Sequence, residues 1–205
     1  LKKEKQDRMI NAALKVFALN GYRHASTDDI VREAAISKGL LFHYFENKLG
    51  VYAFVYDYSV RYLLLELSTA VDAKETDLFT LMQQVETGKM HAMCGYPYLQ
   101  PFLNRAQAEN VNEALAAVEE RKQQMEEAYE NIYARADLGK YAAAEDVVKL
   151  RKMMELTIKG LMNERILEDA FQPEMLYEEI TEYLNLSRRL AERSTQPSDE
   201  AFSEK

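Results

Sequence analysis

The short segment 37–44 carries the side chains best suited to contact another molecule. Lys38, His43 and Tyr44 can hydrogen-bond to phosphate oxygens and to the edges of bases. Ser37 is a preferred helix N-cap, so a helix is expected to begin here. If the apolar side of that helix faces inward, the three polar side chains face solvent. The chemistry they offer is recognition rather than catalysis.

The neighbouring residues predict two short helices joined by a tight turn over the stretch Thr27 to Lys48. Ser26 can cap the first helix, which should end near Ala35. In the second helix Leu41 and Phe45 recur at a four-residue interval, which turns one side inward. Such a unit places its second helix in the major groove of DNA.

The charge of the chain is divided unevenly. The formal net charge is −8, yet residues 1–50 hold nine Lys or Arg against six Asp or Glu, and the remainder holds 17 against 28. Only the first quarter is therefore suited to phosphate, and the rest should be repelled by DNA. This division predicts a small DNA-reading unit on a body with another task.

Composition indicates an all-α protein. Seven glycines and four prolines are few, and Ala, Leu, Glu, Lys, Met and Gln dominate long stretches. A first helix should run from about Lys3 to Asn20 and stop at Gly21, and Asn47 can cap a fourth helix that reaches the polar break Asp72–Thr76. Further helices are expected at 77–94, 97–108, 110–136, 144–169 and 173–193.

These elements predict a three-part organisation. Residues 1–46 form a helix-turn-helix DNA-binding domain, residues 47–193 form a helical effector-binding and dimerisation domain, and residues 194–205 form a polar, disordered tail. The DNA-binding domain, here called the head, is too small to be very stable alone. It should therefore pack on the next helix, which belongs to the second domain, here called the body.

The stretch from Met9 to Lys48 resembles the N-terminal domain of TetR-type bacterial transcriptional regulators. The resemblance rests on Ala13, Phe17, Gly21 and Tyr22 in one run, on the Ser26-Thr27 helix start, on Ser37-Lys38-Gly39 and on the aromatic cluster before Lys48. It implies an Ω-shaped homodimer with about nine helices per subunit. It also implies a body that holds a small effector, and a repressor that leaves its operator when the effector binds.

Two residues depart from the common pattern of that family. Ala35 stands in the turn where glycine is frequent, and a left-handed backbone there would cost about 1 kcal/mol. Phe42 stands where many relatives have a tyrosine that bonds a phosphate, whereas a phenyl ring can only pack or touch a thymine methyl. We expect Phe42 and Phe45 to belong to the core.

The expected DNA contacts come from both short helices and the start of the fourth. Lys38 can reach guanine or a phosphate, His43 a base, and Lys48 a phosphate. Gly39 lets the backbone come close to the duplex. The full predicted set is Thr27, Ser37, Lys38, Gly39, Leu40, His43, Tyr44 and Lys48. Lys2, Lys3 and Lys5 form either an arm along the DNA or a solvated, frayed terminus.

The body is rich in Met and Tyr, which suit a mostly apolar cavity for a small apolar or aromatic effector, although the same residues can simply fill a helical core. The predicted ligand-binding residues are Met82, Met90, Met93, Tyr96, Phe102, Tyr129, Tyr133 and Met154.

The last two helices are amphipathic and should build the dimer, which fits a near-palindromic operator. The predicted interface residues are Met154, Ile158, Leu161, Leu176, Ile180, Tyr183 and Leu184.

Other functional classes find little support. The sequence has no nucleophile setting, glycine-rich phosphate loop or zinc-protease motif, so an enzyme is not expected. His91 and Cys94 share a helical face, but two ligands do not make a metal site, and no cofactor is expected. A single cysteine, with no apolar run of about 18 residues and no signal-like start, predicts a cytoplasmic protein without a membrane partner. The remaining alternative is a helical protein-interaction module that has lost DNA binding.

Overall fold

The structure, a computed structural model, describes residues 3–141, 143–167 and 171–193, and these residues form helices without a strand. Lys2 and the predicted tail 194–205 lie outside the described residues. The all-α prediction is confirmed. No described helix combines the length and the apolar character needed to cross a membrane.

The first four helices follow the predicted caps closely. They are α1 (Lys3–His24), α2 (Thr27–Glu33), α3 (Lys38–Tyr44) and α4 (Lys48–Ala70). The Ser26 hydroxyl accepts from the Asp29 amide at 3.0 Å, and the Ser37 hydroxyl accepts from the Leu40 amide at 3.2 Å. Asn47 caps α4 in the same way. These bonds satisfy amides that a helix start leaves without a partner.

The end of α1 differs in one detail from the prediction. Gly21 has the expected positive φ of 68°, but the chain then continues to His24, so Gly21 is a kink rather than a stop. Tyr22 is turned onto the core by this kink and stacks near Phe17. The kink therefore changes the direction of the chain just before α2 begins.

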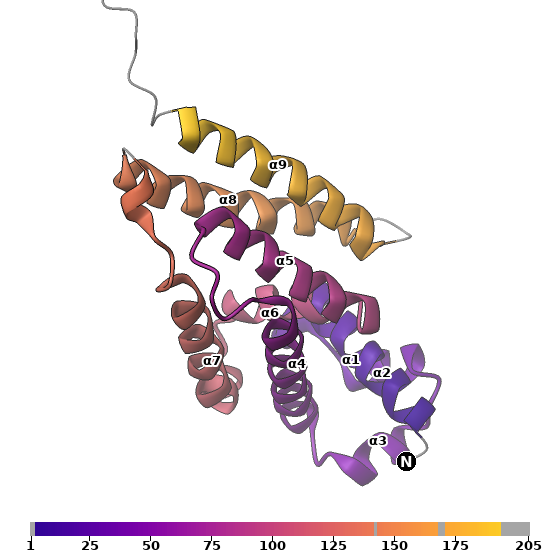
Figure 1. The fold of residues 1–205 in the computed structure, drawn as a ribbon. Helices are drawn as coiled ribbons and strands as arrows, with labels where there is room; N and C mark the ends of the chain where they lie inside the picture. The colour runs from indigo at the N-terminus through magenta and orange to yellow at the C-terminus, as the bar shows by residue number, and fades with distance from the viewer. Residues whose placement is uncertain (1–2, 142, 168–170, 194–205) are drawn as a thin grey trace, which may run out of the picture.

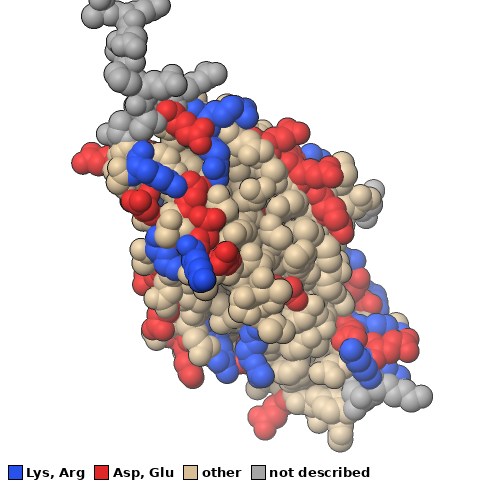
Figure 2. All heavy atoms as spheres, viewed as in Figure 1, with Lys and Arg blue, Asp and Glu red and all other residues tan. Residues whose placement is uncertain are grey.

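The body contains α5 (Leu78–Gly95), α6 (Leu99–Gln107), α7 (Asn112–Tyr133), the 3-10 turn η1 (Leu138–Lys140), α8 (Ala144–Arg165) and α9 (Pro173–Arg193). Each of these α-helices begins within two residues of its predicted start. Figure 1 shows α8 and α9 side by side at one end of the molecule and α3 at the opposite end. On the face in Figure 2, charges of both signs gather along the edges and a broad strip over α5 carries few.

Two apolar clusters hold the helices together. The larger one joins α1, α4, α6 and α7, and at its centre the ring of Tyr52 lies 5.1 Å from that of Phe17 and 5.5 Å from that of Phe102. The smaller one joins α5, α8 and α9. Because α1 shares its core with α4 and α6, the head rests on the body as the sequence predicts.

Candidate nucleic-acid interface and body cavity

The turn between α2 and α3 sets the direction of α3. Ala35 has a φ of 50°, a left-handed conformation that favours glycine. The amide of Ile36 still bonds to the Val31 carbonyl at 3.1 Å, so the turn is closed despite the strained residue. Ala35 therefore adopts the left-handed backbone in which an alanine is strained.

One side of α3 is anchored and the other is open. Leu41 is completely buried, and Phe45, which caps the helix end, packs its ring 5.2 Å from that of Phe54. Leu40 is half-buried. The exposed residues of α3 and its cap are Ser37, Lys38, Gly39, Phe42, His43 and Tyr44.

Phe42 corrects one prediction. Its side chain is 40% exposed, so it does not belong to the core with Phe45. The reason is that a helix of two turns has room for one fully buried position, and Leu41 takes it. An exposed phenyl ring thus lies among the polar groups of α3.

The polar side chains of this surface have few competing contacts. Lys38 forms an exposed ion pair with Asp28 at 2.7 Å, which solvent screens and a phosphate can replace. The rings of His43 and Tyr44 meet edge to face at 4.9 Å. A side chain added at Gly39 would meet nothing within 4 Å, so the backbone there is open to a close approach. Thr27 is half-buried at the start of α2.

Lys48 has an internal role that sequence reasoning missed. Its ammonium donates to the carbonyl oxygens of Tyr22 at 2.8 Å and of Ala25 at 3.2 Å, and it lies 4.4 Å from the centre of the Tyr22 ring. Two of its three donors are therefore used within the protein. The predicted phosphate contact stays a prediction and relies on the third donor.

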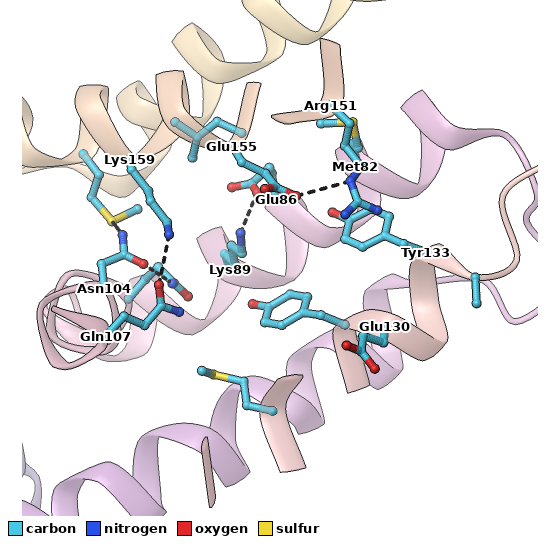
Figure 3. Close-up of a pocket in the computed structure, with 16 residues that line it drawn as sticks. Met82, Glu86, Lys89, Asn104, Gln107, Glu130, Tyr133, Arg151, Glu155 and Lys159 are labelled. Atoms are coloured by element: carbon cyan, nitrogen blue, oxygen red, sulfur yellow. Dashed lines mark hydrogen bonds and ion pairs between the residues drawn. The ribbon is translucent and has the colours of Figure 1, made fainter. Parts of the chain in front are cut away.

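The body contains a cavity of about 480 Å³ between α5, α6, α7 and α8. Met82, Tyr129 and Tyr133 line it, as predicted. Its other lining residues are Glu86, Lys89, Gln100, Asn104, Gln107, Met125, Glu130, Ala134, Arg151, Glu155, Ile158, Lys159 and Met162. Figure 3 shows Asn104, Gln107 and Lys159 together at one end, and Arg151 with Tyr133 at the other.

The cavity is more polar than the sequence predicts. Glu86 and Lys89 form a largely buried ion pair at 2.7 Å. Burial alone would lower the pKa of Lys89, but the adjacent Glu86 carboxylate outweighs it and holds that pKa above its ordinary value. Arg151 lies 3.3 Å from Glu155 and 4.6 Å from the centre of the Tyr133 ring. Amphipathic patterns assign such charged residues to solvent, which is why they were missed.

Two buried polar atoms on the cavity wall lack hydrogen-bond partners in the described part of the chain. They are the Tyr129 hydroxyl and the Gln100 Oε1. Burial raises the pKa of Tyr129, so its hydroxyl remains a neutral donor and acceptor. An unpaired buried polar atom costs about 1–3 kcal/mol, and a ligand with matching groups can recover that energy.

Five of the predicted cavity residues lie elsewhere. Phe102 fills the core beside Phe17, and the Tyr96 hydroxyl bonds to the Tyr58 hydroxyl at 2.6 Å and to Asp7. Met93 and Met154 are buried in the smaller apolar cluster. Met90, on α5, does not line the cavity. Each of these residues matched the expected composition, but composition does not tell which wall of a helix bundle is hollow.

The structure places most of the predicted dimer residues inside the subunit. Met154, Ile158, Leu176, Ile180 and Leu184 are buried inside the subunit, and Leu161 is partly buried, because α9 packs on both α5 and α8. Tyr183 is 40% exposed. The exposed large apolar residues on these helices are instead Val148, Met153, Leu156, Met175, Tyr183, Leu186 and Leu190.

The pair His91 and Cys94 has no third partner for a metal. Among the described residues no group of three His, Cys, Asp or Glu could hold an ion. The Cys94 thiol instead lies 3.2 Å from Glu174.

Known proteins resemble the chain in two ways. The profile of bacterial regulatory proteins of the tetR family matches residues 9–53. The HTH-type transcriptional regulator YuxN of Bacillus subtilis is 36% identical over 78 residues, which are 36% of this chain and 26% of YuxN. The HTH-type transcriptional regulator TtgW of Pseudomonas putida is 41% identical over 49 residues, 24% of this chain and 37% of TtgW. The match thus spans a minor part of either relative.

Solved structures resemble the fold over nearly the whole chain. A TetR family transcriptional regulator from Chloroflexus aurantiacus has a TM-score of 0.55 at 22% identity, covering 94% of this chain and 90% of that one. A TetR family regulator from a Shewanella species has a TM-score of 0.52 at 19% identity, covering 92% and 96%. Residues 9–53 thus match the profile of the tetR family of bacterial regulatory proteins, and the chain as a whole shares the fold of these solved structures.

Proposed function

We propose that the chain is a sequence-specific DNA-binding regulator, most simply a repressor that a small molecule releases from a near-palindromic operator. The observation that carries this proposal is the open side of α3. Lys38, Phe42, His43 and Tyr44 are exposed together at the end of the molecule opposite α8 and α9. A short helix held by one buried leucine and presenting such groups suits the major groove. As a regulator of DNA it would act in the bacterial cytoplasm.

Each exposed group has a distinct expected role at the DNA. Lys38 can reach the acceptors of guanine once its exposed pair with Asp28 opens, and His43 can read a neighbouring base. Tyr44 can bond a phosphate, and Phe42 can touch a thymine methyl. Ser37 and Thr27 supply hydroxyls at the helix starts, Gly39 permits close approach, and Leu40 adds an apolar contact.

The proposed dimer uses the outer faces of α8 and α9. Met153 and Leu156 on α8 and Tyr183 and Leu186 on α9 are large, apolar and exposed, and each pair is three residues apart on one helical face. Two copies packed through these faces would bury the apolar side chains and place the two α3 helices at the same end of the dimer, one on each side of the two-fold axis.

The proposed release uses α6 as the link between cavity and head. Gln100 and Asn104 of α6 line the cavity, while Phe102 of the same helix packs on Phe17 of α1. A ligand that shifts α6 therefore shifts α1 as well. Such a shift changes the affinity for DNA only to the extent that the ligand prefers the shifted state.

Tyr22 adds a second connection between head and body. Its amide donates to Glu109 at 3.0 Å, and its hydroxyl donates to Glu113 at 2.7 Å. These acceptors lie after α6 and at the start of α7. The end of α1 is thus fixed to the loop that follows α6.

The test is selection of bound fragments from bacterial genomic DNA, followed by fluorescence anisotropy with the selected site. We expect an inverted repeat, with affinity that falls steeply as salt increases. Lys38→Met and His43→Ala should change base preference, whereas Lys74→Met, in an exposed loop of the body, should not. Retention of no fragment would favour the alternative of a protein-interaction module.

A further inference from the structure

A second hollow, of about 570 Å³, lies beside the first between α1, α6 and α8. Among the described residues, which leave out 168–170, its charged lining residues are Arg105 and Lys159, and no Asp or Glu of this described set lines it. Leu19, Pro101 and Ile166 supply apolar walls. The body as a whole is acidic, with 28 Asp or Glu against 17 Lys or Arg after residue 50. The positive charge of the described lining is therefore opposite in sign to the net charge of the body.

The two cations carry no ion pair within the described residues. The Lys159 ammonium donates only to the Gln107 side-chain oxygen at 3.0 Å. The carboxylate of Glu109 interacts electrostatically with Arg105. It already accepts hydrogen bonds from the amides of Tyr22, Asn110 and Val111. Arg and Lys side chains that form no ion pair with a described residue, beside apolar walls, match an organic anion, because both pair readily with carboxylate or phosphate.

The two hollows meet at a polar boundary. Asn104, Gln107 and Lys159 line both of them. Figure 3 shows these three residues at one end of the first cavity, where the Lys159–Gln107 bond is drawn. Beyond that boundary, the first cavity offers Met125 and Tyr129 as an adaptable and an aromatic wall.

We propose that the two hollows are one ligand site and that its ligand is an amphipathic organic anion. The acid group lies at Lys159 and Arg105, and the apolar part extends past Gln107 toward Tyr129. The inference rests on the proposed function in treating the first cavity as the effector site. Since Ala18 and Leu19 of α1 line the second hollow, such a ligand touches the first helix of the head directly.

The test compares three probes that differ only at the head group: 6-phenylhexanoate, 6-phenylhexan-1-ol and 6-phenylhexylammonium. Isothermal titration calorimetry with the full chain in the absence of DNA measures each affinity. We expect the carboxylate to bind about tenfold more tightly than the alcohol, and the ammonium to bind most weakly. Lys159→Met should reduce the carboxylate to the affinity of the alcohol, and Arg105→Met should weaken it in the same direction.

The control is Lys149→Met, which removes an equal charge from an exposed position of the same helix. Lys149 lines neither hollow and pairs with Asp146 at 3.2 Å, so this change should leave the order of the probes intact. Equal affinities for the three head groups, no binding of the carboxylate at ~1 mM, or a preference that survives Lys159→Met each overturn the inference. A chain that fails here yet still selects an operator retains the proposed function, so the two failures are distinguishable.

Discussion

The Lys48 ammonium lies 2.8 Å from the carbonyl oxygen of Tyr22, and this bond joins the start of α4 to the end of α1. Because α2 and α3 lie between these two points in the chain, the bond closes the loop that carries α3, the helix proposed to contact DNA. Tyr22 is itself bonded to Glu109 and Glu113 of the body. The position of α3 thus depends on a lysine whose expected partner was a phosphate.

Replacing Lys48 with methionine should lower both stability and DNA affinity. Two hydrogen bonds to the carbonyls of buried residues, Tyr22 and Ala25, are lost, so the free energy of unfolding should fall by about 2 kcal/mol in urea titration. Operator affinity should fall by a similar factor on every sequence, since no base contact is removed. Lys74→Met is the matched control. Unchanged stability would contradict the internal role described for Lys48.

Replacing Ala35 with glycine should relieve strain in the turn before α3. A left-handed alanine costs about 1–2 kcal/mol, and glycine removes this strain from the folded state. Glycine also makes the unfolded chain more flexible, which lowers stability and offsets part of the gain. The free energy of unfolding should therefore rise by about 0.5 kcal/mol. Ala34→Gly, at a buried residue with a φ of −75°, should destabilise instead. Equal losses for both changes, measured by urea unfolding, would be inconsistent with a strained turn.

Replacing Phe42 with tyrosine should strengthen operator binding. The ring is exposed on α3, so the added hydroxyl reaches solvent or a phosphate without burial. One such hydrogen bond is worth about 0.5–1.5 kcal/mol, which corresponds to about twofold to twelvefold in affinity. Phe171→Tyr, the same change in the body beside Tyr98, should leave operator binding unchanged. A variant at Phe42 that binds no better in anisotropy titrations would place this ring away from the backbone.

Replacing Leu186 with glutamate should dissociate the proposed dimer. A charge in the centre of an apolar interface is left without a partner, whereas the same charge on a free monomer is solvated. Leu65→Glu, at a 61% exposed position of α4, is the control for surface charge alone. Analytical ultracentrifugation should give half the mass for Leu186→Glu and the parental mass for Leu65→Glu. A dimer that persists in Leu186→Glu would exclude this face of α9.

The sequence predicts the helices of this protein well because their starts depend on local chemistry. Ser26, Ser37 and Asn47 each cap the helix expected of them, and the positive φ of Gly21 follows from its lack of a Cβ. Which side of α3 is open also follows from one periodic residue, Leu41. Such features need no knowledge of distant contacts.

The body was predicted less well because its residues depend on tertiary packing. Leu176 and Phe102 are apolar and regularly spaced, yet one lies in a core beneath α5 and the other in a core beside α1. Conversely, their polar side chains predict that Lys159 and Gln107 face solvent, but both residues line the two cavities of the body. Periodicity identifies an inward face only when a helix has a single buried side.

In the proposed complex, α3 of each subunit enters the major groove of one operator. Hydroxyl-radical footprinting of the selected fragment with the full chain measures this contact. We expect two protected regions on one face of the duplex, centred about 34 Å apart or somewhat more, which fade together in Lys38→Met/His43→Ala. A single protected region, or uniform protection that the double variant leaves unchanged, would contradict it.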